Sequence, residues 1–179
     1  MEDQDILEKL RDPEAKNYGF NLLVRQYQQR VYWLIRKMVI SHDDADDLTQ
    51  EVFIKIHKNI HTFRHDSQLY TWIYRIATNE CLNFLQRKKR RYFLRLGDLQ
   101  HELMQKLTST EQVSGDDIQL KLQQALLRLP DKQRLVFNMK YFDDLTYEEI
   151  AEITKTSIGA LKASYHLAVK KIEDHLRSH

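Results

Sequence analysis

Nearly the whole chain repeats apolar residues at the spacing of an α-helix, and very few residues that break helices interrupt the pattern. The first long repeat covers residues 20–38, and its apolar positions are Phe20, Leu23, Val24, Tyr27, Val31, Leu34, Ile35 and Met38. Only 4 Gly and 2 Pro occur among the 179 residues, which leaves little material for the tight turns of sandwiches and barrels. The sequence therefore predicts an all-α fold.

Two further helices are predicted in the first half of the chain. The sequence HDDADD, from His42, opens the first of them with carboxylates, which favour a helix N-terminus. The sequence HTFRHDSQ, residues 61–68, interrupts the periodicity and predicts a loop. A third helix follows over residues 69–91, and its apolar stripe is Leu69, Trp72, Ile73, Ile76, Ala77, Cys81, Phe84 and Leu85. We expect this stripe to be buried.

A change in composition divides the chain. The helical pattern weakens from Arg95 onward. Ser, Thr, Gly and Asp gather around residues 114–117, and a second periodic region begins near Ile118. Such polar segments with small residues are typical of linkers. We predict two small helical domains, residues 1–95 and 118–179, joined by a flexible linker over residues 96–117.

The second region contains the spacing of a helix-turn-helix. Thr146 and Glu149 form a capping-box sequence, Ala151 is small where a second helix must cross, and Leu161 follows ten positions later. Between them, Ser157 can cap the second helix. The outward face of that helix would present donors for phosphates and base edges, namely Lys162, Ser164, His166 and Lys170. The alternative is an ordinary helical hairpin with a solvated basic face.

A second basic block ends the third helix of the first half. It consists of Arg87, Lys88, Lys89, Arg90, Arg91 and Arg95. The face opposite the apolar stripe would present Thr71, Arg75, Thr78 and Asn79, and the aromatic residues Phe63 and Tyr70 precede it. Rings, amides and cations together suit single-stranded nucleic acid. The alternative is a solvated helix end whose cations favour the helix C-terminus.

Other groups of polar residues suggest weaker hypotheses. His57, His61 and His65 would share one face of a continuous helix and could hold zinc. The periodicity breaks near His61, so we expect the three to diverge. The aspartates of HDDADD could hold magnesium in a nuclease, but the helix dipole accounts for them more simply. Cys81 lies in the apolar stripe, which predicts an inert core thiol.

Several classes of protein are disfavoured by features that the chain lacks. It has no glycine-rich phosphate loop, so we expect no nucleotide hydrolysis. We also expect no catalytic residue, no cofactor and no metal. A single Cys permits no internal disulfide framework and fits a reducing compartment. The acidic, polar start does not resemble a signal peptide, and no apolar run approaches a membrane span. We therefore expect a cytoplasmic protein without direct membrane insertion.

Two blocks of the sequence resemble a known family. Residues 44–91, from DADDLTQEVF to QRKKRR, look like region two of the extracytoplasmic-function (ECF) group of bacterial sigma factors, in the sigma-70 family. Residues 125–172, from ALLRLPDKQR to AVKKI, look like their region four. Two blocks in the expected order are more specific than either alone. The resemblance implies a sigma factor that directs RNA polymerase to promoters and catalyses nothing itself.

The resemblance also implies roles for individual residues of region two. Binding to the clamp helices of the largest polymerase subunit would fall to Asp47, Gln50, Glu51 and Ile54. The family's pocket for a base of the minus-ten element, turned out of the stack, maps onto Lys55, Asn59, Phe63 and Asn79. We expect the same strand to be held by Arg75, Arg87 and Lys88.

Region four implies the remaining partners. It would read the minus-thirty-five element as duplex through Lys162, Ser164, His166 and Lys170, and it would touch the flap of the second-largest subunit. Many relatives carry Arg where this chain has Ser164, Leu167 and Val169, so Lys170 and Lys171 would neutralise phosphates instead. The family implies promoter DNA, core polymerase and an anti-sigma factor as partners. The alternatives are a stand-alone helix-turn-helix repressor or activator, and a metal-dependent nuclease.

Overall fold

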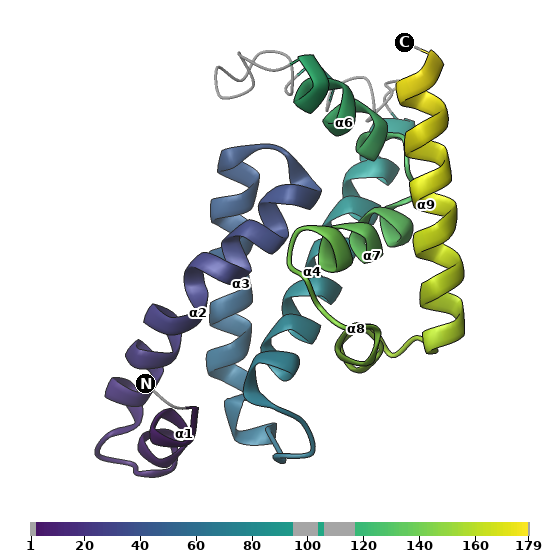
Figure 1. Cartoon of the computed structure of the whole chain (residues 1–179). Helices are drawn as coiled ribbons and strands as arrows, with labels where there is room; N and C mark the ends of the chain where they lie inside the picture. Colours follow the sequence, from purple (N-terminus) through teal and green to yellow (C-terminus); the bar gives the residue numbers. More distant parts are fainter. Residues whose placement is uncertain (1–2, 95–103, 106–116, 179) are drawn as a thin grey trace.

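The computed structural model describes residues 3–94, 104–105 and 117–178 of the chain, and every regular element in these ranges is helical. The first half contains α1 (Asp3–Arg11), α2 (Lys16–Val39), α3 (His42–Asn59), the short 3-10 helix η1 (Ile60–Thr62) and α4 (Leu69–Leu94). The second half contains α6 (Asp117–Leu127), α7 (Asp131–Tyr141), α8 (Tyr147–Thr154) and α9 (Ile158–Ser178) (Figure 1). The prediction of an all-α fold is confirmed.

In the first half, α2, α3 and α4 pack against one another, and α1 packs on α2. Of the stripe predicted for residues 69–85, five residues are buried: Leu69, Ile73, Ala77, Cys81 and Leu85. Trp72, Ile76 and Phe84 are only partly buried at the edge of the same core. The turn between α2 and α3 passes through Ile40, whose φ is 68°, and Ser41 then caps α3 by accepting a hydrogen bond from the N–H of Asp44.

In the second half, α8 and α9 form the predicted helix-turn-helix. The capping box is present, since the Thr146 hydroxyl accepts from the Glu149 N–H (3.2 Å) and the Glu149 carboxylate accepts from the Thr146 N–H (2.7 Å). Lys155 ends α8 in the left-handed conformation. The Ser157 hydroxyl then accepts from the N–H of Ala160 (3.3 Å), and Leu161 is buried. Both caps predicted from the sequence are therefore confirmed.

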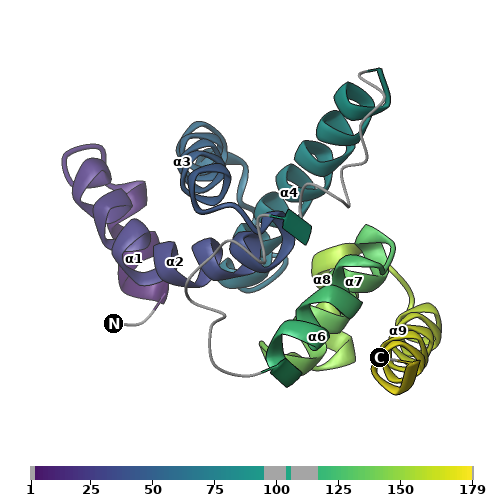
Figure 2. The same ribbon diagram turned by 90° about the horizontal axis from the view of Figure 1, so that it is seen from above.

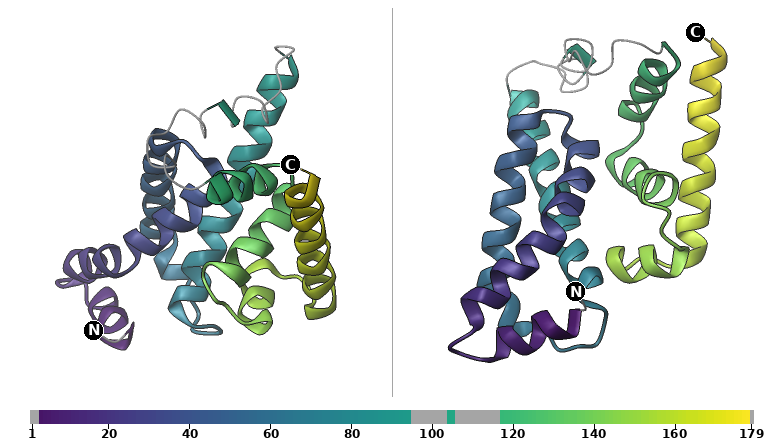
Figure 3. Two further views of the ribbon diagram at one scale, coloured as in Figure 1. Left: turned by 45° about the horizontal axis from the view of Figure 1, so that its top comes forward. Right: turned by 60° about the vertical axis from the view of Figure 1, so that its left-hand side comes forward.

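The two halves lie against each other. Helices α7 and α8 contact α4, and α7 also contacts α2 (Figures 2 and 3). One cluster of buried apolar side chains contains Val31 and Ile73 from the first half together with Met139 and Ile150 from the second. A smaller cluster, around Phe137 and Ala168, belongs to the second half alone. The predicted linker, residues 96–117, lies outside the described residues except at 104–105 and 117.

Candidate nucleic-acid and polymerase interface

Helix α3 presents an acidic face to solvent. The four positions expected to bind polymerase are all exposed: Asp47, Gln50, Glu51 and Ile54. Ile54 is 55% exposed, whereas Leu48 and Val52 on the inner side of the helix are buried. An exposed apolar side chain among carboxylates can anchor a contact with a basic protein surface.

The end of α3, η1 and the first half of α4 bring the expected base pocket together. The Phe63 ring is half-buried and lies 5.6 Å from the ring of Trp72. Asn79 is exposed, and it follows Trp72 by seven residues, so it lies on the same side of α4 about 10 Å further along. Lys55 forms an ion pair with Glu80, the neighbour of Asn79. Phe63 therefore lies against α4 near its start, and Lys55 of α3 reaches α4 beside Asn79.

The side chain of Asn59 is bonded within its own helix, α3. Its side-chain amide donates a hydrogen bond to the carbonyl of Lys55, at 2.8 Å, and the residue is half-buried at the end of α3. This bond fixes the side chain against its own helix and leaves its amide oxygen available as an acceptor.

The polar face of α4 is more covered than the sequence predicts. Thr71 and Thr78 were expected to face outward, and this expectation is wrong, since their exposed fractions are 0% and 2%. Arg75 is half-buried, and its Nη2 donates to the carbonyl of Glu152 in α8, at 3.0 Å. The cause is the packing of α8 against α4, which places the second half on a face that the sequence marks as polar.

The basic block of α4 is divided between exposed and paired cations. Arg87 is exposed. Lys88 is paired with Asp44, at 2.7 Å, and lies 5.6 Å above the ring of Phe84. Lys89 pairs with Asp131 of the second half, at 2.6 Å. Arg87 is therefore better placed to meet a phosphate than Lys88.

The recognition face of α9 is open. Lys162, His166 and Lys170 are exposed and Ser164 is half-buried. The ammonium group of Lys162 lies 5.8 Å above the ring of Tyr147 in α8, which restricts where this long side chain points. The opposite side of α9 packs into the core through Leu161, Ala168 and Ile172. Lys162, His166 and Lys170 follow one another at four-residue spacing on the exposed side of this helix, whereas Ser164 lies next to the buried side, three residues after Leu161 and four before Ala168.

The three histidines proposed as zinc ligands lie in different elements, and Cys81 is buried. His57 packs edge-on against Phe20, at 4.7 Å, whereas His61 lies in η1 and His65 lies beside Phe63 in the following loop. Across residues 3–94, 104–105 and 117–178, no three His, Cys, Asp or Glu side chains are grouped to hold a metal. Cys81 is buried, and burial raises the pKa of its thiol to about 12, so the thiol stays protonated and unreactive near neutral pH.

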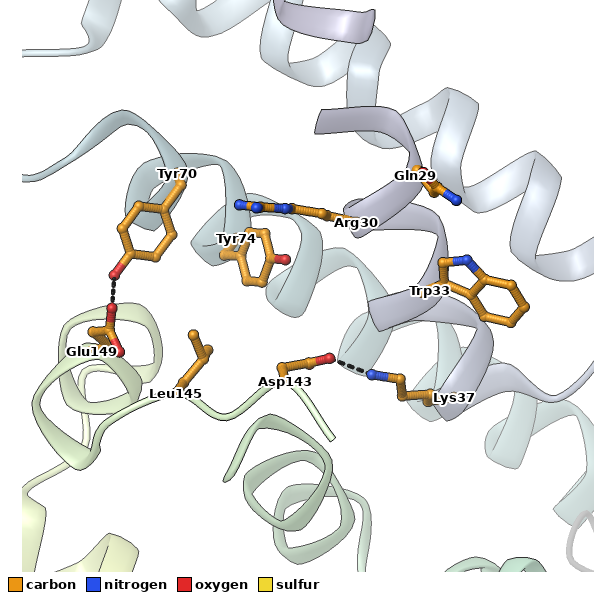
Figure 4. Close-up of a pocket in the computed structure, with 9 residues that line it drawn as sticks. All are labelled: Gln29, Arg30, Trp33, Lys37, Tyr70, Tyr74, Asp143, Leu145 and Glu149. Atoms are coloured by element: carbon orange, nitrogen blue, oxygen red, sulfur yellow. Dashed lines mark hydrogen bonds and ion pairs between the residues drawn. The ribbon is translucent and has the colours of Figure 1, made fainter. Parts of the chain in front are cut away.

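A cavity of about 580 Å³ lies between the halves, and the sequence gives no signal of it. Figure 4 shows its lining residues, which are Gln29, Arg30, Trp33, Lys37, Tyr70, Tyr74, Asp143, Leu145 and Glu149. Lys37 pairs with Asp143, and the Tyr70 hydroxyl donates to the Glu149 carboxylate at 2.6 Å. These bonds cross between the halves.

The bond between Tyr70 and Glu149 shifts the ionisation of both groups. Burial first, and then the neighbouring carboxylate, raises the pKa of Tyr70 to about 12. The hydrogen bonds from Tyr70 and from the N–H of Thr146 lower the pKa of Glu149. The phenol therefore stays neutral and the carboxylate stays charged near neutral pH, so the bond is charge-assisted.

An acidic helix face, exposed cations at the end of α4 and an exposed helix-turn-helix together fit a DNA-binding protein of transcription that also meets a protein partner. The Sigma-70 region 2 family matches residues 23–91, and the Sigma-70 region 4 family matches residues 119–172. No described helix is long and apolar enough to cross a membrane.

Curated relatives agree with these matches over nearly the whole chain. The ECF RNA polymerase sigma factor SigW of Bacillus subtilis (strain 168) is 32% identical, over 89% of this chain and 89% of its own. The ECF RNA polymerase sigma-E factor of Escherichia coli (strain K12) is 31% identical, over 99% of this chain and 95% of its own. The chain belongs to the ECF sigma factors of the sigma-70 family. It directs RNA polymerase to promoters and is not an enzyme.

Solved structures share the fold. The sigma factor RpoE of Bartonella quintana, in complex with the anti-sigma factor NepR, gives a TM-score of 0.66 at 20% identity and covers 88% of this chain and 96% of its own. CnrH, in complex with the cytosolic domain of CnrY, gives 0.67 at 19% identity and covers 98% of this chain and 97% of its own.

Proposed function

We propose that the two halves of this sigma factor share promoter binding. The first half holds the melted strand of the minus-ten element, and the second half reads the minus-thirty-five element as duplex. The observation that carries this division is the open face of α9, with Lys162, His166 and Lys170 exposed, on a different half from Asn79. Both halves act in the cytoplasm as parts of one polymerase complex.

In the first half, Phe63 and Asn79 receive the base that leaves the stack. Extruding a base costs a few kcal/mol, which stacking on a ring and hydrogen bonds to the base edge must offset. Phe63 supplies the ring, and the exposed amide of Asn79 supplies the edge contact. Lys55, Arg75 and Arg87 neutralise the backbone of the strand.

Core polymerase binds through a separate surface. The α3 face with Asp47, Gln50, Glu51 and Ile54 contacts the clamp helices of the largest subunit, and the second half contacts the flap of the second-largest subunit. The acidic side chains orient the encounter and Ile54 supplies buried area. Because this face lies on the side of α3 opposite Leu48 and Val52, binding polymerase requires no change in the core.

Strand binding requires that the halves separate at α4. Arg75 cannot bind a phosphate fully while its guanidinium donates to the carbonyl of Glu152. The contact surface already contains the buried side chains of Thr71 and Thr78, and the Thr78 hydroxyl has no hydrogen-bond partner among the described residues. Burying unpaired polar groups costs free energy, so this side of the contact opens more easily than an apolar one.

The closed arrangement suits control by an anti-sigma factor. RpoE was solved with the anti-sigma factor NepR, and CnrH with the cytosolic domain of CnrY. We extend an anti-sigma partner of this kind to the present chain. A partner that holds α8 on α4 would keep Arg75 away from DNA.

The test is transcription with the purified chain and core polymerase. We expect core to start at discrete sites and give run-off products of defined length. A stand-alone repressor or activator would leave core without such products, and a nuclease would degrade the template.

A further inference from the structure

A second cavity, of about 380 Å³, lies between α1 and the loop that carries Phe63. Its volume is within the range of roughly 300–1,000 Å³ typical of ligand sites. Helix α1 and the start of α2 supply Leu7, Leu10, Arg11 and Lys16, and the segment after α3 supplies Ile60, His61, Phe63 and His65. Figure 3 shows α1 lying across the N-terminal part of α2.

The lining of this cavity separates an apolar floor from a cationic rim. Half-buried leucines, an isoleucine and the Phe63 ring form the floor, the exposed cations Arg11 and Lys16 form the rim, and the exposed imidazoles of His61 and His65 lie beside them. Among the described residues no carboxylate lines the cavity, although Asp12 and Glu14 lie in the intervening turn. Lys16 is also the first residue of α2, so the positive end of that helix dipole lies at the cavity. A flat apolar surface beside a cationic rim suits a nucleotide, with its base on the floor and its phosphate at the rim.

Helix α1 is held firmly enough to act as part of a site. The carboxylate of Asp3 accepts hydrogen bonds from Gln26 (2.9 Å) and from the hydroxyl of Tyr27 (2.6 Å). Ile6 is fully buried. At Gly19, an added Cβ would lie 2.9 Å from the Leu10 nitrogen, so α1 and α2 approach closely only because this residue is glycine. These contacts fix the end of α1 where Arg11 meets His65.

We propose that α1 completes the strand-binding site, with Arg11 and Lys16 binding a phosphate of the melted strand next to the base held on Phe63. The inference rests on the proposed function and extends it to residues that the region 2 match, 23–91, does not include. The ligand is the backbone of single-stranded DNA, because the cationic rim and the Phe63 ring belong to one cavity.

The test measures binding of a labelled single strand of about 12 thymidines to the complex of the chain with core polymerase, with core alone as background. We expect Arg11→Ala and Lys16→Ala each to weaken binding by about tenfold and to lower the salt slope by about 0.7, as expected for the loss of one phosphate contact to a single strand. Arg11→Lys keeps the charge and should restore most of the binding. Lys9→Ala is the matched control, since Lys9 lies on the same helix and does not line the cavity.

A scan with single uncharged methylphosphonate linkages identifies the phosphate. Wild-type binding should fall at one linkage, and Arg11→Ala should be insensitive at that linkage. Competition with free dTMP distinguishes a strand site from a mononucleotide site: displacement of the strand by dTMP at micromolar concentration would overturn the strand assignment. If Arg11→Ala and Lys16→Ala bind the strand with wild-type affinity and salt slope, while the chain still directs initiation at discrete sites, the inference is overturned and the proposed function stands. Failure of the wild-type chain to start transcription would instead contradict the proposed function.

Discussion

Helices α4 and α9 are both long, and both carry cations on a polar face, but only α9 leaves that face open. On α9, Lys162, His166 and Lys170 are exposed. On α4, Thr71 is buried and Arg75 is bonded to α8. Helix α9 lies at the outer edge of the molecule, whereas α4 lies on the side of the first half that contacts the second (Figure 1). A polar face therefore indicates a binding surface only where no other part of the chain covers it.

The contact between the halves combines an apolar centre with a polar edge. Met139 and Ile150 contribute to the buried cluster shared by both halves, and Arg134 is buried beside them, with its Nη2 donating to the carbonyl of Met38 at 2.9 Å. Burial lowers the pKa of Arg134, and its neighbour Asp131 opposes that shift. The coverage of α4 thus depends on a few specific groups, and each can be changed.

Arg134→Met should have the largest effect on the coverage of α4. The change removes the buried bond to Met38 while keeping much of the side-chain volume, so we expect the free energy of unfolding to fall by about 3 kcal/mol, the upper range for a hydrogen bond to a charged group. Urea denaturation followed by circular dichroism measures it. The matched control is Arg128→Met, since Arg128 is exposed and should change stability by less than about 0.5 kcal/mol. Equal stability of both variants would show that this bond does not hold the halves together.

Local features of the sequence predict local structure well in this chain. The caps at Thr146 and Ser157 depend on residues three positions away, and both are present. The spacing from Ala151 to Leu161 likewise depends on two adjacent helices. Such short-range requirements can be read from one sequence without knowledge of the tertiary arrangement.

Contacts between distant segments are what the sequence does not predict. Helix α4 is covered by α7 and α8, whose residues lie more than fifty positions after Thr78 in the chain, and Thr78 is buried. The pairing of Lys88 with Asp44 and the cavity beside Tyr70 also arise from contacts between segments that are distant in the sequence. A threonine on a helix is compatible with solvent or with a neighbouring helix, so its burial is decided by tertiary packing alone. For the same reason, periodicity placed Arg75 correctly on its face but gave no sign of its bond to α8.

Asn79→Ala sharpens the comparison at the open end of α4. Asn79 remains exposed although Thr78 beside it is buried, so we expect this variant to impair promoter opening by about 2 kcal/mol, within the range for an amide that reads a base. Binding of the second half to minus-thirty-five duplex should be nearly unchanged. Opening is followed by 2-aminopurine fluorescence and duplex binding by anisotropy, with Asn83→Ala, an exposed amide one turn further along α4, as control. Equal losses in both assays would contradict the assigned role.

Lys162→Ala tests the open face of α9 directly. A single exposed cation should contribute about 1 kcal/mol to duplex binding, at the low end for a side chain that reads a base. If Lys162 reads a base, the loss should depend on the sequence of the duplex. If it contacts only a phosphate, the loss should be uniform and the salt slope should fall by about one unit. The control is Lys132→Ala on α7, and no change with either sequence or salt would remove Lys162 from the reading face.

Glu149→Gln should have an effect as small as that of Lys162→Ala, and with opposite signs in two assays. Gln keeps the capping box with Thr146 but loses the charge that accepts from Tyr70, so stability at pH 7 should fall by about 1 kcal/mol. Because the folded pKa of Glu149 is lowered from 4.5, its contribution is present above that pH and is lost as the pH falls through the lowered value. The wild type should therefore lose stability below about pH 4.5 more steeply than the variant, and Glu148→Gln, an exposed change on the same helix, should behave like the wild type.

The same variant should bind single-stranded DNA more tightly in the absence of polymerase. Weakening the bond between α8 and α4 raises the population in which Arg75 is released from Glu152, and a strand binds only that population. A coupling of about 1 kcal/mol corresponds to roughly a fivefold gain in affinity. Adding Tyr70→Phe should give little more, since the two changes remove the same hydrogen bond. Lower stability combined with unchanged or weaker strand binding would mean that α8 leaves the strand-binding face of α4 accessible. The coverage of α4 by α8 would then have no effect on DNA binding.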